Sequence, residues 1–371
     1  MSIAMCFRSS FLRAALAGMT VVTLLLSAPP PRPSSLQRAL SMVSETSLRA
    51  NLAFLSSDAL AGRWTASSGL DVAAEFIASR FREVGVTPGN QDSYFQLADL
   101  TELAKTSSGV KNRVLPRQIL ARNVIGLIPG SDPELRNSYI IVSAHYDHIG
   151  TLETAGRMGM DHEANHGDRI FNGANDDGSG TVSLIEIGRA LARSSKRPKR
   201  SVVLIAFCGE EWGLLGSRYY VQHPVFPLSK TLADINIEQV GRSDSDIGKG
   251  NITATGLAFS DITTAIQQAA EQERLKFVQT KENVPYFRAS DNYPFATVGV
   301  PDLTVATSYE FPDYHGLKDE WGRIDFAEMA AVDRALVRAI WRMADSQKAP
   351  QWNASEPQTA SFREAQRKQS R

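Results

Sequence analysis

The chain has 371 residues, with 40 Lys and Arg against 40 Asp and Glu and a pI of about 7.0. This balance produces no overall field that would attract nucleic acid or an anionic membrane, so neither is expected as a partner. The length is sufficient for one large α/β domain after a short N-terminal segment.

The first 28 residues have the pattern of an export signal. Arg8 and Arg13 form a basic flank, residues 14–28 are apolar or small, and a Pro-rich break follows. We therefore expect residues 1–28 to be a signal peptide and the protein to be periplasmic or secreted, with no stable membrane insertion after cleavage. An uncleaved anchor is the alternative, although the apolar stretch is short for a bilayer span.

The rest of the chain alternates between helical and strand patterns. A Pro/Ser-rich lead over residues 29–44 precedes one domain, residues 45–346, and the polar residues 347–371 are expected to be disordered. Helices are expected over residues 45–56, 68–85, 179–193, 212–221, 259–275 and 326–343. Strands are expected over residues 123–128, 139–144, 202–207, 233–240 and 303–306. This alternation favours an α/β fold, a central and mostly parallel (mixed) β-sheet flanked by helices on both faces.

Five side chains of metal-ligating type lie beside the apolar runs, each within its own short motif. They are His145, Asp176, Glu211, Glu238 and His315. Two imidazoles and three carboxylates suit two divalent cations if one carboxylate bridges them. The absence of thiolate favours two Zn²⁺ per chain, with Mn²⁺ or Co²⁺ as possible substitutes. Such a pair of ions can polarise a carbonyl and activate a water, so the motifs predict hydrolysis of an amide bond.

Neighbouring residues have expected supporting roles. Asp147 can reach the far ring nitrogen of His145 and fix its tautomer. Glu210 and Glu211 follow a buried strand and would repel each other without cations, so one can ligate while the other takes a proton from water. Alternatively, such adjacent acids are ordinary helix-start residues. Asp234 shares a strand face with Glu238 and is a weaker rival ligand.

His148 is expected to lie near the site without ligating.

Together these motifs resemble the zinc-dependent co-catalytic aminopeptidase family. That family includes secreted leucyl-type aminopeptidases, glutamate carboxypeptidase II-like enzymes and glutaminyl cyclases. The resemblance covers about residues 45–345, including the segments 55–63 and 288–295. It implies a single-domain zinc exopeptidase architecture and the following site. One metal would be held by His145, Asp176 and Glu238, and the other by Asp176, Glu211 and His315, with Glu210 as general base and Tyr314 at a position that stabilises the oxyanion in some members.

The sequence departs from the family pattern at three places. Glu238 stands where Asp is common, and Asn292 stands where His often follows Ser-Asp. Residues 100–124 are too few to hold the protease-associated insert of many relatives, so the catalytic domain is expected to stand alone.

The leading interpretation is an exported aminopeptidase that acts on a peptide or aminoacyl substrate through metal-activated water, with Glu210 as general base. A glutaminyl cyclase-like acyltransferase with a single zinc is an alternative, although the intact His145 argues against it. A carboxypeptidase or amidase on the same fold, and a catalytically inactive binding domain, also remain open.

Loops 241–251 and 279–286 are expected to form the walls of the substrate pocket. The sequence does not predict the oligomeric state or the preferred residue.

Overall fold

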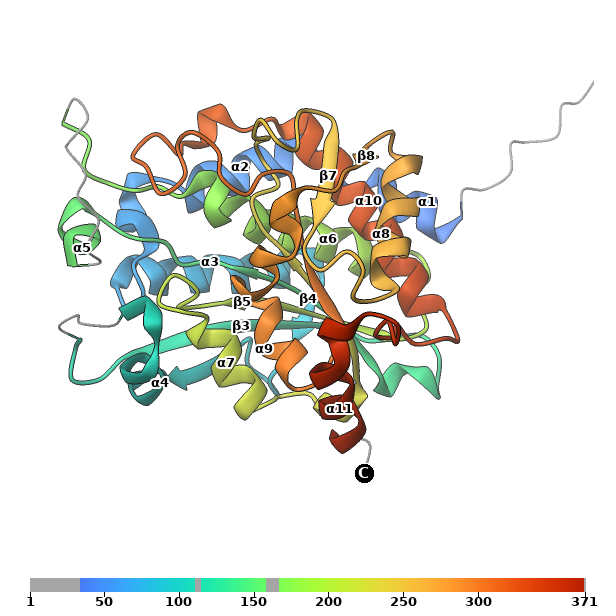
Figure 1. The fold of residues 1–371 in the computed structure, drawn as a ribbon. Coiled ribbons are helices and arrows are strands. Elements are labelled where there is room, and N and C mark those ends of the chain that lie inside the picture. Colours follow the sequence, from blue (N-terminus) through green and yellow to red (C-terminus); the bar gives the residue numbers. More distant parts are fainter. Residues whose placement is uncertain (1–33, 111–114, 158–166, 370–371) are drawn as a thin grey trace, which may run out of the picture. The chain divides into compact units, whose positions relative to one another are not determined.

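A nine-stranded mixed sheet forms the centre of the described part of the chain, residues 34–110, 115–157 and 167–369, in this computed structural model (Figure 1). The strands are β1 (Thr87–Pro88), β2 (Phe95–Asp99), β3 (Leu120–Ile128), β4 (Tyr139–His145), β5 (Ser201–Phe207), β6 (Thr231–Ile237), β7 (Asn251–Ala254), β8 (Lys276–Phe277) and β9 (Asp302–Ala306). The expected signal peptide, residues 1–28, lies outside the described residues.

The strand order is β1-β3-β5-β4-β6-β9-β7-β8, with β2 also paired to β3. The four central strands, β5, β4, β6 and β9, run parallel to one another. Antiparallel pairings occur towards the edges, between β3 and β5 and between β7 and β9. The predicted mixed sheet with a parallel centre is therefore confirmed.

Helices cover both faces of this sheet (Figure 1). They are α1 (Ser35–Ser41), α2 (Glu45–Leu55), α3 (Ser68–Val84), α4 (Thr101–Thr106), α5 (Leu152–Arg157), α6 (Gly180–Ala192), α7 (Leu215–Gln222), α8 (Ile262–Gln272), α9 (Asn292–Thr297), α10 (Phe326–Asp345) and α11 (Ala360–Gln369). Within the described residues, none of these helices combines the length and the apolar character that a membrane span requires.

Strand β5 shows why the centre of the sheet is stable. Its side chains alternate between two separate apolar cores. Val203 and Ile205 belong to the core that includes Tyr220 of α7 and Phe295 of α9. Val202 and Leu204 belong to the larger core on the opposite face, which includes residues of α3, α6 and α10. A strand that is buried on both faces reads as a continuous apolar run, as predicted for residues 202–207.

The longer predicted elements agree with the structure to within a few residues. Helix α3 begins at the Ser67 side-chain cap and ends at Gly85, whose φ of 89° allows the left-handed turn that closes a helix. The predicted strand over residues 233–240 ends earlier, at Ile237, so Glu238 follows the strand directly. The short elements β1, β2, β7, β8, α4, α5 and α9 were not predicted, because two to six residues carry little periodic signal.

The C-terminal segment corrects one prediction. Residues 347–371 were expected to be disordered, yet α11 is a helix and Phe362 and Trp352 are each only 5% exposed. The two rings lie 5.1 Å apart, and the Phe362 ring lies 5.8 Å from that of Phe287. Figure 1 shows α11 beside α9. Two aromatic residues in a polar stretch therefore provide enough apolar contact to order it.

This packing predicts the stability of the C-terminal segment. Phe362→Ala should lower the free energy of unfolding by about 3 kcal/mol, the lower end for truncating a buried Phe. Glu364→Ala on the exposed side of the same helix is the matched control and should leave the denaturation midpoint unchanged. Chemical denaturation of both variants measures this, and equal midpoints would mean that α11 does not contribute to the fold.

Candidate metal centre

The central strands bring the predicted residues to one edge of the sheet. His145 is the last residue of β4, and Glu238 directly follows β6. Glu210 and Glu211 come shortly after β5, and His315 lies in the loop after β9. Because these four strands are parallel neighbours, their carboxyl ends meet, which is where open α/β sheets place their sites.

Asp176 completes the group from the irregular turn Ala174–Ser179, which precedes α6. Its Oδ1 lies 3.3 Å from His145 Nε2, and its Oδ2 lies 3.0 Å from His315 Nε2. One carboxylate therefore faces two imidazoles, each through a different oxygen. This is the arrangement that a bridging ligand requires.

The other two predicted ligands lie on either side of Asp176. Glu238 Oε1 is 3.7 Å from His145 Nε2, and Glu211 Oε2 is 3.3 Å from His315 Nε2. The structure thus brings all five predicted side chains together, with Glu238 near His145 and Glu211 near His315. Asp234 is not part of either group, because its Oδ1 accepts a hydrogen bond from Ser143 beneath the site.

Burial gives these carboxylates unusual proton affinities. Burial raises the pKa of Glu238 to about 7, even though the His145 charge and the Ser290 hydrogen bond lower it. Burial likewise raises the pKa of Glu210 well above its usual range, against the opposing charge of His145. Burial disfavours a charged His315 ring, but Glu211 and Asp176 outweigh it and raise its pKa to about 11. Burial also disfavours a charged His145 ring, but Glu210, Asp147 and Asp176 outweigh it and raise its pKa well above the usual value. Without a bound cation, both rings therefore favour the charged form.

The donor set fits a divalent cation. Asp176 Oδ2 is buried and makes no hydrogen bond within the described residues, although ring nitrogens of His315 and His148 lie near it. The ion pairs of the Glu210, Glu211 and Glu238 carboxylates are with histidines, and within the described ranges none is with Lys or Arg. Imidazole nitrogens and carboxylate oxygens without thiolate are ligands that Zn²⁺ accepts. Cations at this position would neutralise carboxylates that otherwise repel one another.

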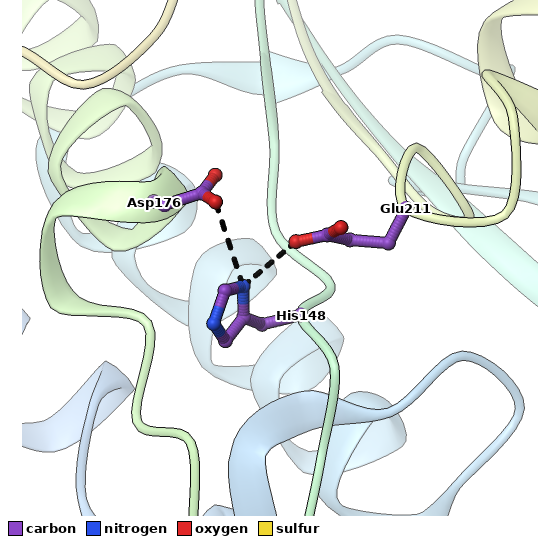
Figure 2. A group of neighbouring side chains, drawn as sticks. All are labelled: His148, Asp176 and Glu211. Carbon is purple, nitrogen blue, oxygen red and sulfur yellow. Dashed lines mark hydrogen bonds and ion pairs between the residues drawn. The ribbon is translucent and has the colours of Figure 1, made fainter. Parts of the chain in front are cut away.

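His148 lies closer to this centre than the sequence suggested. Figure 2 shows its ring nitrogen directed towards Glu211 and Asp176. Nδ1 is 2.8 Å from Glu211 Oε1 and 3.9 Å from Asp176 Oδ2, and the side chain is fully buried. The three residues offer ligand atoms within 4.8 Å of one another. His148 is therefore either the hydrogen-bond partner that orients Glu211 or a competing ligand.

Two further aspartates shape the turn that carries Asp176. Asp177 accepts hydrogen bonds from the backbone N–H groups of Gly180, Gln239 and His145, which connects the turn to both β4 and β6. Asp319 accepts from the N–H of Asp176. Nothing in the sequence around Asp319 distinguishes it from other acids.

Arg63 ends the segment 55–63 that is part of the family resemblance, and in the structure its side chain connects two turns. Its fully buried guanidinium donates to the carbonyl oxygens of Tyr146 (2.8 Å) and Gly173 (2.9 Å). It also donates to the carbonyls of Leu55 and Asn172. Burial lowers its pKa to about 10, against the opposing effect of nearby aspartates. Arg63 thus joins the β4 turn to the Asp176 turn.

The predicted catalytic side chains lie around the same centre. Asp147 Oδ1 is 3.6 Å from His145 Nδ1, although the ring contacts the Asp147 backbone oxygen more closely, at 3.2 Å. Glu210 Oε2 is 3.9 Å from His145 Nε2, and the Glu210 N–H donates to Asp147. The Tyr314 ring stacks on His315 with centroids 4.0 Å apart.

Comparison with known proteins agrees with this geometry. Residues 123–340 match the sequence profile of peptidase family M28. The chain belongs to peptidase family M28. This places it among zinc metallopeptidases, the enzyme class that the motifs predicted.

Individual relatives are distant. A probable zinc metalloprotease of Leptosphaeria maculans is 23% identical over 316 residues, which cover 75% of this chain and 68% of that protein. The chain spans 34% of the length of two further curated relatives that it matches. The aminopeptidase LapA of Legionella pneumophila has a similar structure, with a TM-score of 0.63 at 17% identity over 88% of this chain and 79% of that one. The glutaminyl cyclase of Porphyromonas gingivalis gives a TM-score of 0.59 at 18% identity over 80% and 97% of the chains. These structural similarities establish the fold.

The two residues that depart from the family pattern, Glu238 and Asn292, are each held by hydrogen bonds. The Ser290 hydroxyl donates to Glu238 Oε1, so the longer Glu side chain is held in place. Asn292 accepts from Thr304 of β9 and donates to the backbone oxygen of Phe287. It therefore connects the sheet to the turn that precedes α9.

The position of Glu238 yields a test of the ligand set. Glu238→Gln should weaken the zinc site nearer His145 by at least about tenfold and leave the His315 site nearly unchanged, because an amide is a poorer cation ligand than a carboxylate. Glu238→Asp should retain partial activity with lower zinc affinity, because the shorter side chain must bridge the distance now spanned by Glu. Zinc titration by calorimetry measures both.

Asp234→Asn is the matched control. Asp234 lies on β6, the strand that leads to Glu238, but its side chain accepts a hydrogen bond from Ser143. It should bind zinc as the unmodified protein does. If Asp234→Asn loses zinc while both Glu238 variants keep two tight equivalents, then Asp234 is the ligand instead.

Proposed function

We propose that this protein is an exported aminopeptidase that uses two zinc ions to hydrolyse the first peptide bond of its substrates. The observation that carries the proposal is the position of Asp176, whose two oxygens face His145 and His315 while Glu210 lies beside the same centre. One zinc would be held by His145, Asp176 and Glu238, and the other by Asp176, Glu211 and His315. Mn²⁺ or Co²⁺ are possible substitutes.

Bound zinc would polarise the scissile carbonyl and lower the pKa of a water molecule. The protein's own residues then perform the proton transfers. Glu210 is buried and has a raised pKa, so it is suited to accept a proton from water and to donate it to the departing amine. Tyr314 lines the cavity at the centre. Its hydroxyl would stabilise negative charge that develops on the carbonyl oxygen. Asp147 and His148 would orient His145 and Glu211.

A glutaminyl cyclase activity is the main alternative, because a cyclase shares the fold. We favour the peptidase because His145 lies within reach of both Asp176 and Glu238, which supports a complete first metal site. A carboxypeptidase or amidase differs from an aminopeptidase only in the substrate end that it recognises, and the metal centre alone does not distinguish them.

Export is proposed from the sequence alone. The basic flank and the apolar segment within residues 1–28 support removal of a signal peptide and a periplasmic or secreted location. Mass spectrometry of the exported protein would find a start close to Pro29, and an N-terminus that still includes Arg8 would indicate an anchor.

A substrate panel tests the proposed activity. The zinc-loaded protein should hydrolyse aminoacyl amides and short peptides that have a free N-terminus, and it should not act on N-acetylated versions of the same peptides. Equal cleavage of blocked peptides from the C-terminal end would identify a carboxypeptidase. Cyclisation of an N-terminal glutamine without hydrolysis would identify a cyclase.

The role of Glu210 can be separated from metal binding. Glu210→Gln should keep two equivalents of zinc and lose at least about 10²-fold in kcat, because general-base catalysis contributes a factor of that order. The adjacent variant Glu211→Gln is the comparison and should lose zinc as well as activity. Normal turnover in Glu210→Gln would place the base elsewhere.

A further inference from the structure

A small cavity adjoins the metal centre. It has a volume of about 50 Å³, and His145, Asp176, Glu210 and Glu238 form part of its lining. The rest of the lining is made by Gln239, Thr255, Tyr286, Ala289, Ser290, Thr304, Tyr309 and Tyr314. The cavity therefore lies next to the position that a scissile carbonyl beside Glu210 would occupy.

Three residues of the cavity lining carry buried Thr or Ser hydroxyl groups. Thr255, Thr304 and Ser290 are each no more than 3% exposed. Ser290 donates to Glu238, and Thr304 donates to Asn292. The Thr255 hydroxyl accepts from the Thr304 N–H at 2.9 Å, and the described contacts include no acceptor for its own proton. The cavity therefore offers a hydroxyl donor beside its apolar lining residue Ala289.

The side wall of the cavity is fixed by contacts on both sides. Tyr286 and Tyr309 stack with ring centroids 4.9 Å apart and an interplanar angle of 7°. The Tyr309 hydroxyl accepts from the buried Asn283 side chain at 2.9 Å, and the Tyr286 hydroxyl donates to Glu310. Displacing the Tyr309 ring would break its buried hydrogen bond with Asn283, which is costly, whereas the Tyr286 contact with Glu310 is exposed.

This stacked pair also separates two cavities of different size. Tyr286 and Tyr309 line a second cavity of about 570 Å³ on their far side, together with Asp244, Asp246, Glu282 and Glu310. The size of the inner cavity is therefore set by a pair of rings, with ample space behind them.

The volume limits which side chains fit. A cavity of about 150 Å³ accepts a benzene molecule, and one water position needs about 10–15 Å³. About 50 Å³ therefore accommodates only a few heavy atoms. A methyl or hydroxymethyl group fits, whereas an isobutyl or benzyl group does not.

We propose that this cavity selects substrates whose first residue is small, namely Gly, Ala or Ser, and that the Tyr286–Tyr309 pair excludes larger residues. The Thr255 hydroxyl would donate to the side-chain oxygen of Ser. This selectivity rests on the proposed aminopeptidase function, and it specifies the substrate class that such an enzyme would accept.

Binding of amino-acid hydroxamates tests the selectivity without turnover, since a hydroxamate chelates zinc and carries the side chain of the first residue. Calorimetry on the zinc-loaded protein should give Ala and Ser hydroxamates a Kd at least about tenfold lower than Leu and Phe hydroxamates, because each poorly accommodated methylene costs a factor of this size. Equal binding of all four, tighter binding of the large ones, or no binding at all would overturn the proposal.

Two variants locate the selectivity. Tyr286→Ala should join the two cavities, so that Leu and Lys hydroxamates gain at least about tenfold in affinity while Ala hydroxamate changes little. Tyr286→Phe keeps the ring, loses only the contact with Glu310, and should retain the original ratio. An unchanged ratio in Tyr286→Ala would show that the ring is not the barrier.

The hydroxamate measurement also separates the two proposals. A protein that prefers Ala hydroxamate but cleaves no free N-terminus would contradict the aminopeptidase function and leave the size limit in place. A protein that hydrolyses Leu and Ala substrates equally well would be an aminopeptidase without this limit.

Discussion

The central constraint on this structure is the burial of four carboxylates at one edge of the sheet. Asp176, Glu210, Glu211 and Glu238 lie together with little exposure to water, and such a cluster of like charges opposes folding unless positive groups face it. Arg63 supplies part of that charge from behind the turns. Divalent cations would supply the remainder, so metal binding and local stability are coupled at this edge.

The parallel strand order makes the cluster possible. Because β5, β4, β6 and β9 end together, residues far apart in the sequence become neighbours without long loops. The supporting bonds are made largely to the backbone. Arg63 donates to four carbonyls and Asp177 accepts from three N–H groups, so the ligand positions are defined by main-chain geometry as well as by side-chain packing.

Sequence reasoning recovered the residues whose signal is local. His145 ends an apolar strand and Glu211 follows another. A continuous apolar run and the polar residues after it were therefore sufficient to place both at strand ends. His148, Asp319 and Arg63 were not assigned their contacts, because each acts on a segment distant in the sequence. The partners of these three residues are a carboxylate or backbone groups, and no sequence pattern marks such contacts. The C-terminal helix was missed for a related reason, since its apolar contacts come from only two aromatic residues.

The packing of that helix has a consequence for how relatives should be compared. Phe362 contacts Phe287, the residue after Tyr286, so the C-terminal segment supports from behind the turn that holds one ring of the cavity wall. The M28 match ends at residue 340, before this segment begins. Two members of the family can therefore share every metal ligand and still accept different substrates. The helix that packs against the cavity wall lies outside the segment that the family profile covers.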